Sequence, residues 1–189
     1  YGGGSLKAYE TLPDPRFMFM HAPFNAALPR VIYVLRDPRD TMVSYWHYHR
    51  LTVEGFDLSL HDFIAKDDHW PCRWDEHVAG WLLKKRHPRL LIVRYEELHR
   101  DALATLSRVF EFSGMRYDMV ELEKAVEASS FDRMQAAENE KGAGLVSAPM
   151  KNERFVRKGK IGAWKDEMDA ECTRLLEEKY KAVMNKVGY

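Results

Sequence analysis

A short apolar run followed at once by a charged turn is the feature that most restricts the fold of this chain. Residues 31–35 read Val-Ile-Tyr-Val-Leu, and this density of β-branched residues indicates a strand that is buried on both faces. Asp37 follows within two residues and can cap a helix whose first turn begins at Pro38. A strand that turns directly into a helix is the unit of α/β proteins, so we expect that class of fold.

The same alternation continues along the chain. A second apolar strand is predicted at residues 90–95, where the sequence reads Leu-Leu-Ile-Val-Arg-Tyr. Helices are predicted at 74–85, from about 103 to a stop near Gly114, at 119–128 and at 169–185. Strands that alternate with helices predict a parallel sheet with helices on both faces. We expect residues 1–189 to form one domain with a flexible start at residues 1–5.

Charge and composition narrow the kind of partner. Lys plus Arg and Asp plus Glu both number 29, so the net charge is zero. A neutral chain has no broad attraction to nucleic acid or anionic membrane, although a local basic pocket is compatible with it. No apolar run has the length of a membrane span, and Cys72 and Cys172 form no CxxC pair. We therefore expect no nucleic-acid or membrane partner, and a reducing, cytoplasmic setting.

Arg36 and Ser44 are the first candidates for a binding site. Arg36 stands where the first strand ends, and Ser44 lies two turns further along the following helix. Ligands of α/β sheets gather at the carboxyl ends of the strands, where a guanidinium can bind a phosphate bidentately. The alternative is that Arg36 only forms a surface ion pair with Asp37 or Asp40.

The second candidate is the basic segment, residues 155–165, which reads Phe-Val-Arg-Lys-Gly-Lys-Ile-Gly-Ala-Trp-Lys. It combines four cations and two glycines around one tryptophan. Glycines let a backbone approach an anion closely and offer amides to it, while Arg and Lys neutralise its charge. The alternative is a solvated basic loop in front of the last helix.

These two segments resemble two elements of the cytosolic sulfotransferases. Residues 157–165 are similar to that family's RKGxxGDWK element, with Ala163 in place of Asp. Residues 36–45 are similar to its YVxRNPKDxxVSYYHF element, with Asp37 for Asn and Arg39 for Lys. Further similarity lies, in the family's order, at residues 59–63, 74–81, 95–97, 111–114 and 129–131, so that it spans most of residues 12–166. The resemblance implies an α/β, P-loop NTPase-like sulfotransferase fold with a parallel sheet flanked by helices.

The resemblance also implies a co-substrate, 3′-phosphoadenosine 5′-phosphosulfate (PAPS), with 3′-phosphoadenosine 5′-phosphate (PAP) as product and no metal. Arg36 and Ser44 match the residues that hold the 3′-phosphate of PAPS in the family. The matching positions that close over the same phosphate are Phe155, Val156, Arg157, Lys158 and Gly159. The matching positions around the adenine are Tyr95, Ser129, Phe131 and Met134. Cations and amides suit the phosphate, while hydroxyls and an aromatic face suit the base.

His21 falls where the family carries the catalytic histidine of a KTHLP element. It would take the proton of the acceptor as general base, a task that its near-neutral titration suits. Phe19, Met20 and Phe24 flank it and are expected to line a pocket for a small hydrophobic acceptor, such as a phenol, a steroid or an alcohol. For residues 17–18 a buried strand is an equally good interpretation.

The sequence departs from the family most strongly at its beginning. The family's first strand and a phosphate-binding loop resembling TYPKSGTTW have no counterpart among the 189 residues. We therefore expect a fold that is incomplete at its amino end and leaves apolar surface uncovered. That loop supplies amides and a lysine to the 5′-phosphosulfate, and loss of such a clamp commonly costs several kcal/mol of transition-state stabilisation. Little or no turnover is expected from the printed chain alone.

Two smaller departures concern the acceptor and the assembly. Phe19 replaces the lysine of KTHLP, which removes a polar group near the transferred sulfonyl. The family's dimer motif should begin at Lys165, but Asp169, Ala170 and Arg174 interrupt it. The sequence therefore supports the family's homodimer only weakly.

Two alternative functions stay open. One is a catalytically dead remnant that binds 3′-phosphoadenosine nucleotides or a protein partner. The other is a nucleotide kinase-like phosphotransferase, which would need the same phosphate-binding loop together with carboxylates that bind magnesium. Nothing in residues 36–45 suggests a metal site.

Overall fold

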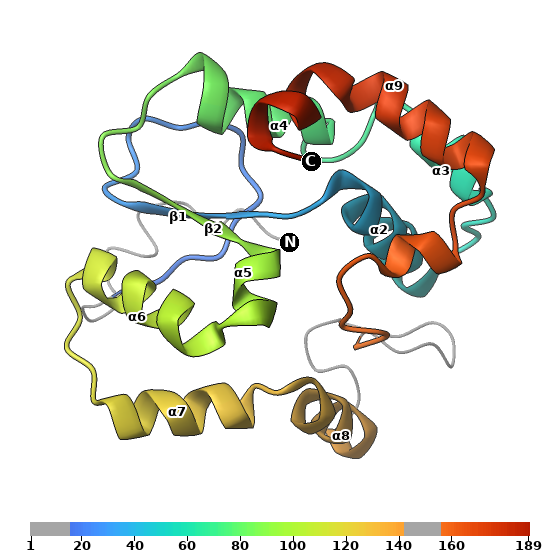
Figure 1. Ribbon diagram of the computed structural model, residues 1–189. Helices are drawn as coiled ribbons and strands as arrows, with labels where there is room; N and C mark the ends of the chain where they lie inside the picture. Colours follow the sequence, from blue (N-terminus) through green and yellow to red (C-terminus); the bar gives the residue numbers. More distant parts are fainter. Residues whose placement is uncertain (1–15, 142–155) are drawn as a thin grey trace.

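The computed structural model describes residues 16–141 and 156–189. The chain runs through β1 (Val31–Leu35), α2 (Pro38–Thr52), α3 (Leu60–Ala65), α4 (Trp74–Val78), the π-helix η1 (Ala79–Lys84), β2 (Leu90–Arg94), α5 (Tyr95–Arg100), α6 (Ala102–Ser113), α7 (Met119–Ala128), α8 (Phe131–Lys141), the 3₁₀ helix η2 (Ala163–Asp166) and α9 (Ala170–Val187). Figure 1 shows β1 and β2 at the centre, with helices above and below them.

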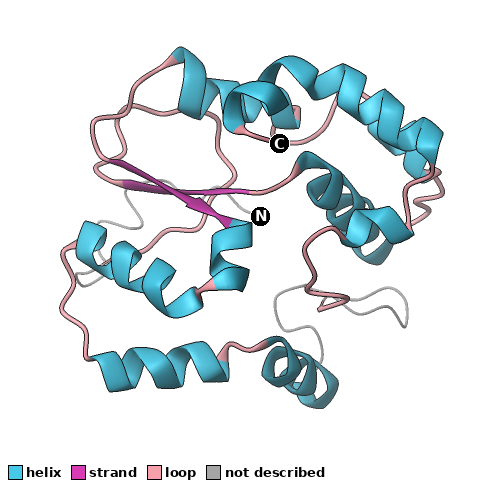
Figure 2. Cartoon of the chain, in the orientation of Figure 1, coloured by secondary structure: helices cyan, strands magenta, loops and turns pink. Residues whose placement is uncertain are grey.

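The sheet is parallel, as predicted, and its described part consists of β1 and β2 in register from Val31 opposite Leu90 to Leu35 opposite Arg94. One face packs on α4, η1 and α9, where Tyr33 and Leu35 of β1 join a buried cluster with Trp81. The other face carries α6, which contacts β2. Figure 2 shows the two strands between these groups of helices, so the α/β class is confirmed.

A second buried cluster holds α2, α3 and α9 together beside the sheet. It is built from residues such as Val43 of α2, Ile64 of α3 and Leu176 of α9, none of which is more than 1% exposed. Lys179 of α9 adds a polar contact, because its ammonium donates to the carbonyls of Ile64 and Ala65 at the end of α3. The helix that follows β1 is therefore fixed firmly from one side.

Helix boundaries follow local signals in the sequence. Asp37 caps α2 by accepting a hydrogen bond from the amide of Arg39 at 2.8 Å, with Pro38 in the first turn, as predicted. α6 ends at Gly114, whose φ of 74° is open to glycine at little cost, and α7 spans the predicted residues 119–128. The predicted helix 74–85 is divided into α4 and η1, whereas α3 and α8 were not predicted.

Part of the sheet surface is apolar and open, as expected for a chain with no counterpart of the family's first strand, and the prediction that β1 is buried on both faces is therefore wrong. Val34 on β1 is 56% exposed and Ile92 on β2 is 41% exposed, although both lie within strands.

Within the described residues, no helix combines the length and the apolar character needed to cross a bilayer.

Candidate functional site

A large cavity lies where β1 passes into α2. Its volume is about 1540 Å³, and its walls are formed by residues 16–22, β1, the inner side of α2, Tyr95, the start of α8 and residues 156–160. The carboxyl ends of parallel strands are the usual place for a ligand in an open α/β sheet. The volume exceeds that of a typical drug-sized site, so the cavity has room for two small molecules side by side.

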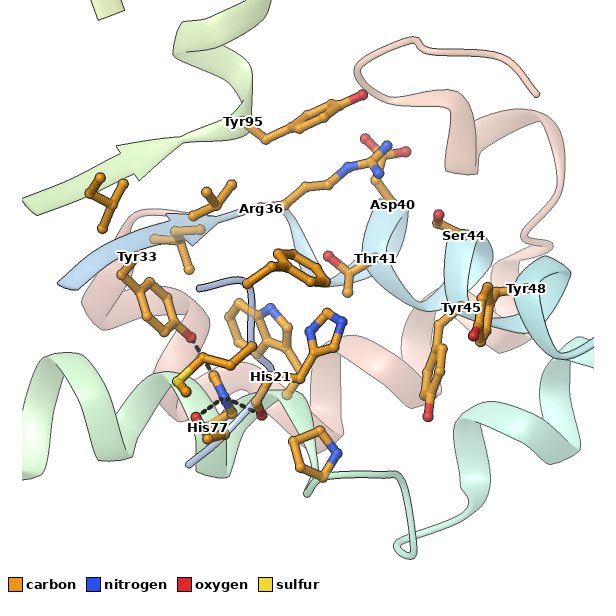
Figure 3. Close-up of a pocket in the computed structure, with 18 of the residues that line it drawn as sticks. His21, Tyr33, Arg36, Asp40, Thr41, Ser44, Tyr45, Tyr48, His77 and Tyr95 are labelled. Carbon is orange, nitrogen blue, oxygen red and sulfur yellow. Dashed lines mark hydrogen bonds between the residues drawn. The ribbon is translucent and has the colours of Figure 1, made fainter. Parts of the chain in front are cut away.

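Arg36 enters this cavity directly from the end of β1, as Figure 3 shows. Its guanidinium carbon lies 4.1 Å from the centre of the Tyr95 ring, a cation–π contact that holds the side chain in place. Its Nε is buried and has no hydrogen-bond partner among the described residues. Asp37 instead pairs with Arg39 at 2.7 Å, so the predicted alternative, an Arg36–Asp37 surface pair, is not what the structure contains.

Asp40 joins α2 to the basic segment. Its buried carboxylate, 3% exposed, accepts hydrogen bonds from the amides of Gly162 at 2.7 Å and Trp164 at 3.0 Å. This contact helps to place residues 157–160, which line the same cavity as Arg36. The sequence suggested only that Asp40 is a helix-end charge or a partner of Arg36; its contact with a segment far along the chain was missed.

Arg157 and Lys158 meet at one carboxylate, Glu167. Lys158 lies 3.0 Å from Glu167, Arg157 donates to the same oxygen, and His47 of α2 bonds its other oxygen. Burial alone would raise the pKa of Glu167, but the hydrogen bonds from His47, Lys158 and Arg157 outweigh it and lower that pKa to about 2. Glu167 therefore remains ionised and gathers the two cations beside the cavity. No motif or spacing indicated this role for Glu167.

Substitution Glu167→Gln is expected to flatten the pH dependence of stability at acid pH. The folded-state pKa, about 2, lies below the ordinary 4.5, so the unfolded chain binds more protons as pH falls. The stabilisation by Glu167 is complete above 4.5 and is lost toward 2. Urea unfolding at a series of pH values should show the two proteins converging in that window. Glu178→Gln, at a position 67% exposed, is the control and should leave the profile unchanged.

Helix α8 packs closely against the basic segment. Val156 donates its amide to Glu138 at 2.8 Å, and its carbonyl accepts from the Gln135 amide at 3.2 Å. Gly159 has a φ of 56° and lies so near the Phe131 ring that a Cβ there would come within 2.2 Å of it. Glycine is therefore required at this position both by the backbone conformation and by the close approach. The predicted adenine residue Phe131 and the predicted phosphate residue Gly159 are in direct contact.

His21 lines the same cavity and lies away from Tyr95 and the guanidinium of Arg36 (Figure 3). Its ring meets the edges of Phe19 at 4.8 Å and Trp70 at 5.6 Å between ring centres. Burial, and to a lesser degree His77, lowers the pKa of His21. A lowered pKa keeps the imidazole neutral at physiological pH, which is the form that accepts a proton.

Most of the predicted site residues line this cavity. They are His21, Phe19, Met20, Arg36, Ser44, Tyr95, Phe131, Met134, Val156, Arg157, Lys158 and Gly159. Ser129 does not: it is an exposed residue at the end of α7. Phe24 does not either, because its ring packs on Trp81, with 5.0 Å between ring centres, in the cluster between the sheet and α4, η1 and α9. Phe155 lies outside the described residues.

An aromatic wall beside His21 was missed in the sequence. Tyr45, His69 and Trp70 line the cavity there, and the Tyr45 hydroxyl donates to the Trp70 carbonyl at 3.0 Å. Burial lowers the pKa of His69, so this wall is uncharged near neutral pH. Tyr45 lay within a recognised motif, but residues 69–70 come from a loop whose place in the fold depends on long-range packing. The wall suits a flat, apolar molecule.

No group of His, Cys, Asp and Glu side chains suited to a metal ion occurs in residues 16–141 and 156–189. The chemistry of the cavity is instead that of cations and amides on one wall and aromatic rings around a histidine on the other.

Fold and cavity together define an α/β protein with cationic side chains lining a cavity at the carboxyl end of a parallel strand. The profile described as "Sulfotransferase domain" matches residues 4–188, and the chain belongs to that family. It is 28% identical to Sulfotransferase 1C2 of Oryctolagus cuniculus, covering 95% of this chain and 65% of the relative. It is 30% identical to Cytosolic sulfotransferase 1 of Danio rerio, covering 96% of this chain and 64% of the relative. The chain thus spans less than two thirds of the length of these relatives.

Solved structures show the same fold. Mouse sulfotransferase SULT7A1 complexed with PAP matches with a TM-score of 0.69 at 25% identity, over 82% of this chain and 58% of that one. Retinol dehydratase in complex with androsterone and the inactive cofactor PAP matches with a TM-score of 0.77 at 24% identity, over 97% of this chain and 57% of that one. The predicted sulfotransferase fold is therefore confirmed.

Proposed function

We propose that the protein acts in sulfonyl transfer from PAPS to a hydroxyl or amine of a small hydrophobic acceptor such as a phenol, a steroid or an alcohol. One observation carries the proposal: Arg36 and the Arg157–Lys158 pair, distant in sequence, line the same cavity. We further propose a cytoplasmic, single-domain protein, in keeping with its similarity to Cytosolic sulfotransferase 1.

In this proposal the nucleotide lies against the cationic wall of the cavity, which is formed by Arg36, Arg157 and Lys158. Arg36 binds the 3′-phosphate in the orientation set by its contact with Tyr95, and Ser44 of the next helix adds a hydroxyl. Arg157 and Lys158 close over the phosphate from the other side, and Phe131 offers its ring to the adenine. Bidentate guanidinium binding favours a terminal phosphate over a sugar hydroxyl, which makes the 3′-phosphate the feature that is recognised.

The acceptor lies against the aromatic wall formed by Tyr45, His69 and Trp70. There the neutral His21 takes the proton from the acceptor oxygen while that oxygen attacks the sulfur. The bond between sulfur and the bridging oxygen of PAPS breaks, and PAP leaves with that electron pair. Phe19 and Trp70, whose rings meet the His21 imidazole, offer apolar surface to the acceptor beside the base.

A second candidate function is binding of 3′-phosphoadenosine nucleotides without turnover. It requires only groups that bind the phosphate and the base. Arg36, Phe131 and Arg157, which line the cavity, are suited to this. Transfer of labelled sulfonyl from PAPS to a phenol, measured on the protein at its natural full length, separates the two: PAP binding with no product supports the second candidate, and product formation supports the first.

The nucleotide assignment is tested by isothermal titration with PAP and with AMP, which differ in the 3′-phosphate. PAP is expected to bind about 10- to 100-fold more tightly than AMP, because a charge-assisted hydrogen bond contributes about 1.5–3 kcal/mol. Arg36→Ala should remove most of this preference. Arg174→Ala, the same change at a position 70% exposed outside the cavity, should preserve it. Equal affinity for PAP and AMP in the unmodified protein would contradict the assignment.

A further inference from the structure

The segment that carries His21 is held in place by side chains. Residues 20–23 form no helix or strand, and within the described part of the chain the carbonyls of His21 and Ala22 accept no backbone hydrogen bond. They accept instead from His77 of α4, whose Nε2 lies 3.2 Å from the His21 oxygen and 3.0 Å from the Ala22 oxygen. The indole of Trp81 in η1 also donates to Ala22, at 3.1 Å.

The hydrogen bonds of His77 specify one tautomer. A carbonyl oxygen only accepts, so Nε2 must carry the proton that it donates. Nδ1 is then the acceptor, and its partner is the Tyr33 hydroxyl at 2.8 Å, which therefore donates (Figure 3). Tyr33 lies on β1 and is 8% exposed, and burial raises its pKa, so its hydroxyl keeps its proton. Burial likewise lowers the pKa of His77, which keeps the ring neutral.

These contacts connect β1, α4 and the candidate general base in one chain of hydrogen bonds. From this geometry we propose that His77 is the positioning residue for His21, and that Tyr33 sets the tautomer in which His77 does so. His77 donates to the backbone of His21, while Phe19 and Trp70 pack against its ring. The inference rests on the proposed function in one respect only, namely that His21 is the base whose position matters.

The test compares His77→Phe with His77→Gln. Phe keeps a ring but has no donor, whereas the Gln amide can donate to the same carbonyls as Nε2 does. The readouts are the NMR titration of the His21 ring protons and the rate at which diethyl pyrocarbonate modifies His21, followed by mass spectrometry. His77→Phe is expected to raise the His21 pKa and to increase its modification rate several-fold. His77→Gln should restore values near those of the unmodified protein.

Two further variants separate positioning from a general loss of fold. Tyr33→Phe removes a single hydroxyl and should move the His21 signals in the same direction but less far. His61→Phe, at a histidine whose side chain is 43% exposed and which does not line the cavity, should move neither readout. Unchanged His21 signals in both His77→Phe and Tyr33→Phe would overturn the proposal. PAP affinity, measured on each variant, reports separately on the proposed function, because the cationic wall is untouched by these changes.

Discussion

Asp40→Ala is expected to weaken PAP binding strongly and to destabilise the fold by about 3 kcal/mol, since it leaves two partly buried amides without an acceptor. The amides are those of Gly162 and Trp164, which the carboxylate now holds at 2.7 and 3.0 Å. Their release removes the Asp40 contact and leaves the bond between His47 and Glu167 as the remaining tie of this region to α2. The basic segment is then less firmly placed, so Arg157 and Lys158 are held less well at the cavity. Chemical unfolding measures the first effect, and PAP titration measures the second.

Asp118→Ala is the matched control for this prediction. Asp118 also accepts from two backbone amides, those of Val120 at 2.9 Å and Glu121 at 3.2 Å, but it caps α7 and does not line the cavity. It should cost about 1 kcal/mol as an ordinary helix cap and leave PAP affinity unchanged. Retention of full PAP affinity by Asp40→Ala would show that the Asp40 contact does not organise the site.

Gly159→Ala is expected to weaken PAP binding by about 10- to 100-fold. The backbone there has a φ of 56°, and the new Cβ would come within 2.2 Å of the Phe131 ring. Strain of about 1–3 kcal/mol accompanies a non-glycine residue in such a conformation when its surroundings cannot relax. Either the ring or the basic segment must shift, and both belong to the proposed nucleotide site. Isothermal titration with PAP measures the loss.

Gly162→Ala is the comparison that shows the effect of backbone strain without a steric clash. Gly162 has a φ of 74°, but no atom lies within 4 Å of the position of its Cβ. It should therefore show backbone strain alone and a smaller loss of affinity. In the double variant Gly159→Ala/Phe131→Ala the clash is absent, so the two changes should be strongly non-additive. Additive losses would indicate that the ring and the glycine act independently.

The parts of the fold that the sequence predicted well are those with local causes. The apolar run of β1, the cap at Asp37 and the stop at Gly114 each act within a few residues, and the structure has the expected elements there. Arg36 could be chosen as a site residue for the same reason, because its position at a strand end follows from the strand alone.

The parts that could not be predicted depend on contacts between distant segments. α8 is a polar helix without an apolar stripe, so periodicity gave no signal for it. Glu167 meets His47 only because α2 packs beside η2, and its ion pairs with Arg157 and Lys158 depend on how the intervening turn folds back, which no spacing encodes. Phe24 lies near His21 in sequence, but its side chain packs on the buried cluster that contains Trp81 and does not line the cavity.

The α2 helix carries Asp40 and Ser44 four residues apart, and therefore on the same side. One of them anchors the wall that bears Arg157, and the other faces the cavity directly. The distance between the wall that bears Arg157 and the hydroxyl of Ser44 is thus set by one turn of α2. Insertion of one residue between positions 40 and 44 would turn Ser44 by about 100° around the helix axis. We therefore expect this one turn of α2 to be the part of the site least tolerant of a change in length.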